Sequence, residues 1–205
     1  MLQKEKKGEK IVTSKPPKKA VFMVTGNIHK FNEARRVLNE FGLSTAMLNV
    51  DTIEIQADKI EDVAKASAID AARTCCLPLI VEDAGLFIES LNGFPGPYSS
   101  YVFRTIGTKG ILKLMKNAGK RNAFFESVVA FCLPKLKVPR CFHGEIKGEI
   151  TNEIRGQAGF GFDPVFVSSE GSEKTFAEMS VAEKNRYSHR ARALREFAEW
   201  YVSQL

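Results

Sequence analysis

The chain has few of the residues that build disulfide, zinc or membrane-spanning structures. Its four cysteines comprise the adjacent pair Cys75 and Cys76 and two in apolar runs, Cys132 and Cys141, and no C-x-x-C pair occurs. This pattern predicts reduced core thiols and argues against zinc or a redox motif. No stretch reaches the ~18 to 20 apolar residues of a membrane span, and no apolar run near the first residue is typical of a secretory signal. We therefore expect a cytoplasmic protein with no membrane partner.

Positive charge is concentrated at one end of the chain. Residues 1–19 contain seven lysines and two glutamates, and so carry +5 of the formal net charge of +6. Because the run KPPKK at 15–19 favours neither helix nor strand, we expect 1–19 to form a basic, disordered arm. Residues 20–205 are then a single domain of nearly neutral charge. A nucleic-acid-binding protein that uses the arm is one alternative, although such contacts would be non-specific.

Apolar periodicity predicts strands that alternate with helices. The predicted strands are 21–24, 45–55 (ending near Glu54), 79–83, 124–133, 140–150 and 165–167. The predicted helices are 31–41, 60–75, 98–106, 109–117, 181–185 and 189–203. Alternating elements with one antiparallel stretch predict an α/β fold with a mixed sheet flanked by helices.

Two carboxylates follow a strand with the composition of a sheet centre. Leu79–Val81 is an apolar run, Glu82 and Asp83 come directly after it, and Gly85 is expected to let the chain turn at once. Ligands of open α/β sheets bind beyond the carboxyl ends of strands. Two adjacent acids remain charged together most easily when a cation joins them. The pattern predicts a divalent-metal or general-base site, and an acidic turn without a function is the alternative.

A polar loop connects the first strand to the first helix. Residues 25–30 read TGNIHK and offer backbone N–H groups, a hydroxyl, an amide and an ammonium at a helix N-terminus, a common binding place for anions. The spacing of a P-loop is absent. Phosphate binding and an ordinary strand-to-helix turn are both compatible with these residues.

A glycine-rich segment carries two aromatic residues. Residues 156–164 read GQAGFGFDP, in which Phe160 and Phe162 flank Gly161 and Asp163 precedes a proline. Aromatic faces stack on nucleobases, and a nearby carboxylate accepts from a base N–H. A glycine-rich turn with two core phenylalanines is the alternative.

The last predicted helix begins with two basic residues. Ser188 is the expected N-cap, which places His189 and Arg190 in the first turn, where the helix dipole disfavours cations. We therefore expect an anionic or polar ligand to hold them, with Lys184 on the preceding helix.

Taken together, these motifs resemble the inosine triphosphate pyrophosphatase family (Ham1-like, XTP/dITP pyrophosphatases) over residues 21–203. The matching motifs stand in the family order and are Thr25-Gly26-Asn27 with Lys30 and Glu33, Glu54-Ile55-Gln56, Glu82-Asp83 with Gly85, Gly93-Phe94-Pro95-Gly96, Phe160-Gly161-Phe162-Asp163-Pro164, Ala177-Glu178-Met179, Glu183-Lys184-Asn185 and Ser188-His189-Arg190.

The resemblance implies an elongated mixed sheet with an active-site cleft between two lobes, and a homodimer. It also implies a house-cleaning hydrolase that cuts ITP, dITP and XTP into a monophosphate and pyrophosphate with Mg²⁺, for which Mn²⁺ can substitute. By position, the metal ligands would be Glu54 and Asp83, with Glu82 a further candidate, and Asp83 would also accept the proton of the attacking water. The phosphates would bind to Thr25, Gly26, Asn27, Ile28, His29 and Lys30. The base and adjoining groups would bind to the backbone of Ala84 and to Phe160, Gly161, Phe162, Asp163, Lys184, His189 and Arg190.

The chain departs from the family pattern at two positions. Ala84 stands where many members have Ser or Thr, and Ser67 stands where many have Lys. Lys65 would point about 200° away from position 67 on an ideal helix, so it is no simple replacement. Neutralisation of a triphosphate then depends more on Lys30 and the metal. A similar Maf-like pyrophosphatase with another base preference and a nucleotide-binding module without catalysis are further alternatives. The FGFDP and SHR motifs argue against the first, and the three acids argue against the second.

Overall fold

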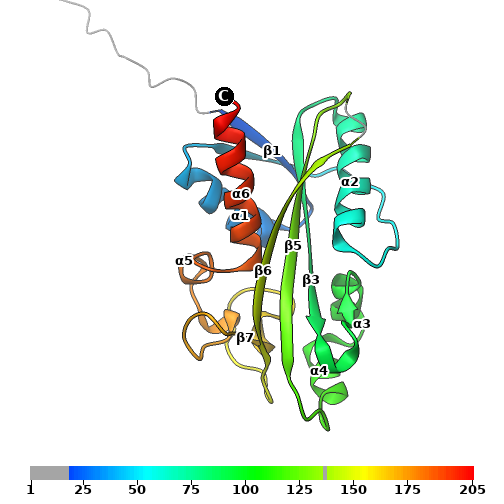
Figure 1. Ribbon diagram of the computed structural model, residues 1–205, viewed down its shortest axis with the longest axis vertical. Helices are drawn as coiled ribbons and strands as arrows, with labels where there is room; N and C mark the ends of the chain where they lie inside the picture. Colours follow the sequence, from blue (N-terminus) through cyan, green and yellow to red (C-terminus); the bar gives the residue numbers. More distant parts are fainter. Residues whose placement is uncertain (1–18, 136–137) are drawn as a thin grey trace, which may run out of the picture.

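A mixed sheet of seven strands forms the centre of the molecule, and its long strands run along the longest axis (Figure 1). The structure, a computed structural model, describes residues 19–135 and 138–205. The strands are β1 (Ala20–Val24), β2 (Ser44–Leu48), β3 (Leu79–Ile88), β4 (Pro95–Gly96), β5 (Asn122–Cys132), β6 (Arg140–Ile150) and β7 (Phe166–Ser168). The α-helices are α1 (Ile28–Glu40), α2 (Ile60–Cys75), α3 (Ser99–Thr105), α4 (Gly107–Leu114), α5 (Val181–Lys184) and α6 (His189–Ser203). Short 3₁₀ turns are η1 (Glu89–Leu91), η2 (Asp163–Val165) and η3 (Phe176–Glu178).

The pairing of the strands confirms the predicted mixed sheet. The order is β2-β1-β3-β5-β6-β7, and β4 adds to the far end of β3. β1 is parallel to β2 and to β3, whereas β3 with β5, β5 with β6 and β6 with β7 are antiparallel. The expected arm lies outside the described residues, apart from Lys19.

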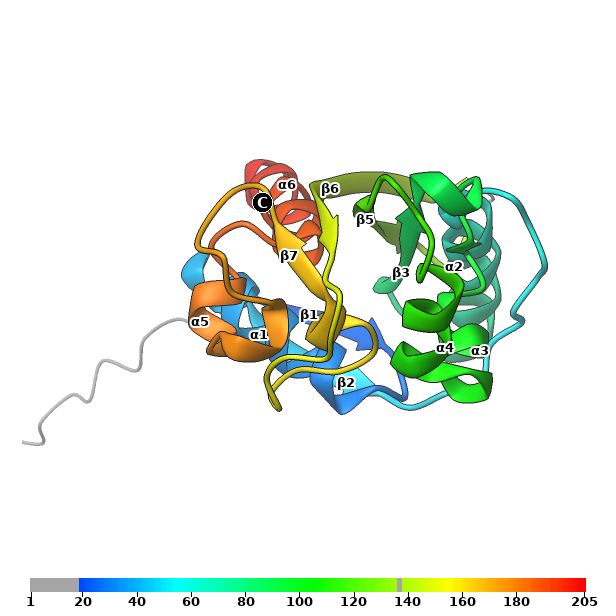
Figure 2. The ribbon, with the colours of Figure 1, turned by 90° about the horizontal axis from the view of Figure 1, so that it is seen from below.

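Helices cover both faces of the sheet around β3, so neighbouring β3 residues belong to different cores. Ile80 packs with α1 and α6 in one cluster, whereas Leu79 and Val81 pack with α2 in another. A third cluster fills the opposite end of the sheet, where Leu86, Phe125 and side chains of α3, α4, β7 and η3 meet. Figure 2 shows β7 and α5 on one side of this end and α3 and α4 on the other. None of the helices within the described ranges is long and apolar enough to cross a membrane.

The expected turn at Gly85 is wrong, because β3 continues to Ile88. Gly85 lies opposite Glu126 inside the sheet, and a Cβ there would lie 2.4 Å from the carbonyl oxygen of Gly96. This glycine therefore permits close approach of β4. The strand that does end is β1, whose pairing with β3 stops at Val24 opposite Val81. The two acids that follow Val81 consequently lie beyond the carboxyl end of β1.

The predicted strand 45–55 is too long, because β2 ends at Leu48. Leu48 pairs with Val24, the last residue of β1, and β1 is the sole neighbour of β2 in the strand order. Within the described part of the chain, the residues after Leu48 therefore have no partner strand, and Glu54 lies in an irregular segment that leads to α2. The other predicted elements agree with the structure to within three residues at each end.

Candidate active site

The side chains of the loop between β1 and α1 hold the start of the helix. Asn27 is the N-cap, and its Oδ1 accepts hydrogen bonds from the backbone N–H groups of His29 at 2.9 Å and Lys30 at 3.2 Å. The Thr25 Oγ1 accepts from the Asn27 N–H at 3.1 Å. Several groups that the sequence offers to phosphate are thus used to shape the loop. The capping role of Asn27 was missed, although Asn is a preferred N-cap residue.

Lys30 connects this loop to the acidic pair on β3. Its Nζ lies 3.2 Å from the Glu82 carbonyl oxygen, 3.2 Å from the Glu82 Oε2 and 3.8 Å from the Asp83 Oδ1. Lys30 therefore brings the loop between β1 and α1 together with the two acids.

Glu82 is a buried counter-ion. Its side chain has no exposed surface, and its Oε1 accepts a hydrogen bond from the Ser127 Oγ at 2.6 Å and lies 3.0 Å from the Arg190 Nε. Burial alone would raise the pKa of Glu82, but the charges of Arg190 and Lys30 outweigh burial and hold that pKa well below its usual range. With its oxygens occupied by protein donors, Glu82 is a poor metal ligand. The contact from Ser127 on β5 has no signal in the sequence.

Asp83 is the accessible carboxylate of the pair, with 28% of its side chain exposed. Its Oδ1 accepts a hydrogen bond from the Ala84 N–H at 2.9 Å. Burial raises the pKa of Asp83, Lys30 opposes that rise, and the carboxylates of Glu82 and Glu54 add to it, so the net shift is upward. Asp83 is consequently a stronger base than an ordinary aspartate.

Glu54 is an exposed acid whose charge acts on Asp83, and α2 holds its segment in place. The Ser67 Oγ donates to the Ile53 carbonyl at 2.9 Å, and Asp70 accepts from the Ile53 N–H at 3.1 Å. Ser67 thus supports the loop that carries Glu54, while Lys65 pairs with Glu61.

The repulsion between these two carboxylates fits a cation site. Among residues 19–135 and 138–205, no group of three or more His, Cys, Asp or Glu side chains is placed to hold a metal ion. Glu54 and Asp83 would therefore be a two-carboxylate set, which is a usual protein contribution to Mg²⁺ binding.

A buried network of ion pairs lies behind the acidic pair and is centred on Glu33 of α1. The Glu33 Oε1 lies 2.9 Å from the Lys184 Nζ, and its Oε2 lies 2.6 Å from the Arg190 Nη1. Lys184 also contacts the Asp163 Oδ2 at 2.6 Å, and Arg190 also contacts Glu82. This network joins the FGFDP loop to β3.

Glu33 and Arg190 hold each other in their charged forms. Burial would raise the pKa of Glu33, but Arg190 and Lys184 outweigh burial and lower it. Burial would lower the pKa of Arg190, but Glu82 and Glu33 outweigh burial and raise it. We expected an anionic or polar ligand to hold His189 and Arg190, whereas in this structure Arg190 is held by two glutamates of the protein itself, Glu33 and Glu82.

His189 lies in the core and is not a cation. Ser188 is the predicted N-cap of α6, since its Oγ accepts from the Ala191 N–H at 3.3 Å. The His189 ring stacks on Phe125 with centroids 4.6 Å apart, and the residue is 2% exposed. Burial, followed by the charges of Arg190 and Lys184, lowers the pKa of His189 well below 6.5. A neutral imidazole removes the expected conflict with the helix dipole.

The two phenylalanines of the FGFDP motif have different environments. Phe160 is partly buried, and its N–H donates to the Asp163 Oδ2 at 2.9 Å. Phe162 is 3% exposed and meets the Phe103 ring edge-to-face at 5.5 Å. The expectation that both rings offer faces to a base is wrong for Phe162, which is a core residue. Gly161 lies between them with a φ of +63°.

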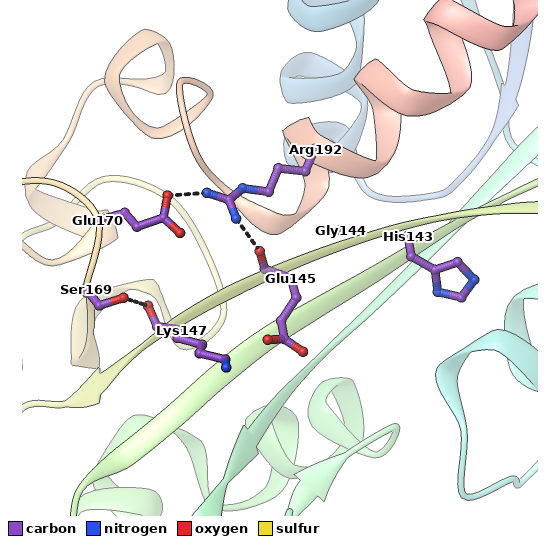
Figure 3. Close-up of a pocket in the computed structure, with 7 residues that line it drawn as sticks. All are labelled: His143, Gly144, Glu145, Lys147, Ser169, Glu170 and Arg192. Carbon is purple, nitrogen blue, oxygen red and sulfur yellow. Dashed lines mark hydrogen bonds and ion pairs between the residues drawn. The ribbon is translucent and has the colours of Figure 1, made fainter.

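A pocket of about 470 Å³ lies at the exposed edge of β6, lined by His143, Gly144, Glu145, Lys147, Ser169, Glu170 and Arg192 (Figure 3). Arg192 pairs with Glu170 and donates to the Glu145 carbonyl at 2.9 Å, and the Ser169 Oγ donates to the Lys147 carbonyl at 3.0 Å. The Arg192 and Ser169 side chains thus satisfy carbonyl groups of β6 beyond its short pairing with β7. The Lys30–Asp83 region is the stronger candidate for a functional site, because the side chains of this pocket are used in contacts with the protein backbone and with one another.

The chain belongs to the Ham1 family, whose sequence model matches residues 21–200. It is 50% identical to the dITP/XTP pyrophosphatase of Methanopyrus kandleri over 185 residues, which are 90% of this chain and 97% of the relative. It is also 50% identical to the dITP/XTP pyrophosphatase of Methanothermobacter marburgensis over 182 residues, which are 89% and 96%. The family resemblance predicted from the motif order is confirmed.

Solved structures have the same fold. The HAM1 protein from Coxiella burnetii superposes with a TM-score of 0.79 at 28% identity, over 90% of this chain and 99% of that one. The Staphylococcus aureus Ham1 protein superposes with a TM-score of 0.77 at 25% identity, over 91% and 100%. The predicted α/β fold class is confirmed.

Proposed function

We propose that the protein hydrolyses the nucleoside triphosphates dITP and XTP, together with ITP, and that the reaction takes place beside Asp83. Sequence similarity supports this activity, because relatives that are 50% identical over nearly the whole chain are dITP/XTP pyrophosphatases. The observation that carries the site assignment is that Lys30 and Asp83 meet where β1 ends and α1 begins. Hydrolysis would remove these nucleotides from the cellular nucleotide pool. A cytoplasmic location would suit this role.

The triphosphate would bind at the N-terminus of α1. The helix dipole and the Lys30 ammonium favour anions there. Asp83 would accept a proton from water as the water oxygen bonds to the α-phosphorus, and pyrophosphate would leave with the electron pair of the broken P–O bond. The raised pKa of Asp83 suits this role as a general base.

Mg²⁺ is the proposed cofactor, with Glu54 and Asp83 as its ligands and Mn²⁺ as a substitute. When bound, the ion would neutralise phosphate charge and relieve the repulsion between the two carboxylates.

The base would stack on Phe160 and be recognised by the buried donors near that ring. Lys184 Nζ lies 5.0 Å and Arg190 Cζ lies 5.2 Å from the Phe160 ring centroid. Hypoxanthine and xanthine have a carbonyl at position 6 that accepts from such donors, whereas adenine has an amino group there. A site built around a polar contact can reject an analogue that lacks it by ~10⁴.

The test is pyrophosphate release from ITP, dITP, XTP, GTP and ATP, with and without Mg²⁺. We expect ITP, dITP and XTP to be cleaved far more efficiently than ATP. ATP cleaved as efficiently as ITP would overturn the proposed specificity and leave a general nucleotide pyrophosphatase.

A homodimer is the proposed assembly. One short segment around α3 carries five exposed large apolar side chains, namely Phe94, Tyr98, Tyr101, Phe103 and Ile106. Such a concentration is typical of interaction surfaces. Light scattering after gel filtration should give twice the chain mass, and Tyr101→Asp should reduce it to the mass of one chain.

A further inference from the structure

His29 covers the ring of Phe160. The two rings are stacked, with centroids 5.5 Å apart and planes inclined by 20°. His29 is an exposed residue in the first turn of α1, and Phe160 belongs to the FGFDP loop, far away in the sequence. Each is held by its own backbone contact, His29 by the Asn27 cap and Phe160 by Asp163.

Two buried cations also lie close to the Phe160 ring. The Lys184 ammonium and the Arg190 guanidinium lie 5.0 and 5.2 Å from its centroid, and both residues are 2% exposed. Because these cations are buried while His29 is exposed, the face of the ring that His29 covers is its outward face, the one that a ligand can reach.

We propose that His29 and the purine base compete for this outward face of Phe160, so that the imidazole leaves the ring when a nucleotide binds. The inference rests on the proposed function. A base inserted between the His29 and Phe160 rings would stack on both of them. Each stacking contact takes up about 3.5 Å, so the two ring planes would have to be about 7 Å apart. Ring centroids 5.5 Å apart leave no such space. His29 therefore sets the affinity for the base, and its side chain does not serve the phosphates.

The competition predicts an effect of His29→Ala on KM. Removal of the imidazole should lower the KM for ITP by roughly two- to tenfold, the factor that one aromatic stack contributes. The KM for ATP should fall by the same factor, because any base has to displace the same ring. His29→Phe restores an aromatic cover and should return KM to the wild-type value or above. A higher KM in His29→Ala would assign the imidazole to the phosphates and overturn the inference, as would an unchanged KM.

His143→Ala is the matched control, since this exposed histidine lies on β6 and contacts Glu61 and Glu126 instead of Phe160. Its KM should equal that of the wild type.

A binding experiment tests the displacement without turnover. The chain has three histidines, so the His29 ring-proton resonances can be assigned by comparison with His29→Ala. In the free protein these resonances should be shifted by the Phe160 ring current, and IMP should move them toward the position of an exposed histidine. A His29 resonance that stays shifted while IMP saturates the protein would overturn the inference. Equal cleavage of ATP and ITP would contradict the proposed base specificity but not the competition between His29 and the base. The KM of His29→Ala would still test that competition.

Discussion

Replacement of Glu33 by glutamine should remove the central charge of the buried network at nearly constant volume. Glu33 is 3% exposed and contacts Lys184 at 2.9 Å and Arg190 at 2.6 Å. In the variant, Lys184 retains Asp163 and Arg190 retains Glu82. Each cation nevertheless loses one of its two counter-charges, and the amide nitrogen of glutamine cannot accept from either of them.

The expected loss in the free energy of unfolding is about 2–4 kcal/mol. Removal of one partner from a buried ion pair costs about 3–5 kcal/mol, because the other charge is left uncompensated. The remaining carboxylates and the amide oxygen of the new side chain reduce that figure. For a chain of this length each kcal/mol lowers Tm by about 2–4 °C, so Tm should fall by roughly 5–15 °C.

Glu40→Gln is the matched control on the same helix. Glu40 is exposed and lies 3.3 Å from Arg195 at the surface, and such pairs contribute less than about 1 kcal/mol. Urea denaturation of both variants at pH 7.5 can be followed by the fluorescence of Trp200, the single tryptophan, which packs on Phe131 and Phe142. Equal unfolding free energies for the two variants would refute the reasoning.

Four further expectations follow from the site and the sequence. Asp83→Asn should lower kcat at least ~100-fold without lowering Tm, because the raised pKa means that the charge of Asp83 does not stabilise the fold, and turnover above a third of the wild-type value would exclude Asp83 as the base. EDTA should abolish activity and Mg²⁺ or Mn²⁺ should restore it, whereas restoration by zinc alone would contradict a carboxylate site. The folded-state pKa of His189 lies below 6.5, and those of Glu33 and Glu82 lie below 4.5. The contribution of His189 to the free energy of unfolding is therefore complete above pH 6.5, and that of the two glutamates is complete above pH 4.5. Tm should therefore fall as pH drops below 6.5 and fall more steeply below 4.5, and a Tm that is constant down to pH 4 would be inconsistent with these shifts. Deletion of residues 1–19 should weaken retention on heparin and leave kcat/KM within about twofold, and a loss of activity would mean that the arm contributes to the site.

The sequence predicts most elements of the fold because their apolar periodicity is local. It misplaces the ends of two strands, because a strand ends where its partner ends. Leu48 is the last residue of β2 since β1 stops opposite it at Val24, and the β-compatible residues up to position 55 have nothing to pair with. Gly85 was interpreted as a turn, whereas it allows β4 to approach β3 closely. Neither partner is evident from the residues themselves.

The sequence also predicts which residues gather at the site but not how they are paired. The helix dipole correctly indicates that a cation at the start of α6 needs an anion. Local sequence cannot reveal that Glu33 supplies it, because Glu33 and Arg190 are 157 residues apart in the sequence. Likewise, the motif FGFDP does not distinguish Phe160, which borders the site, from Phe162, which fills the core.

The division of roles between Glu82 and Asp83 follows from the geometry of a strand. Neighbouring strand residues face opposite sides of a sheet, so the two acids cannot act as one pair of ligands on one face. Ile80 and Glu82 face α1 and α6, where Arg190 and Lys30 neutralise Glu82. Asp83 shares the face of Val81, on which α2 lies and to which the Glu54 segment is tied. The sequence analysis kept Glu82 as a candidate metal ligand because two adjacent acids remain charged together most easily when a cation joins them. With β3 continuous, a single carboxylate of the pair faces Glu54, and it is Asp83.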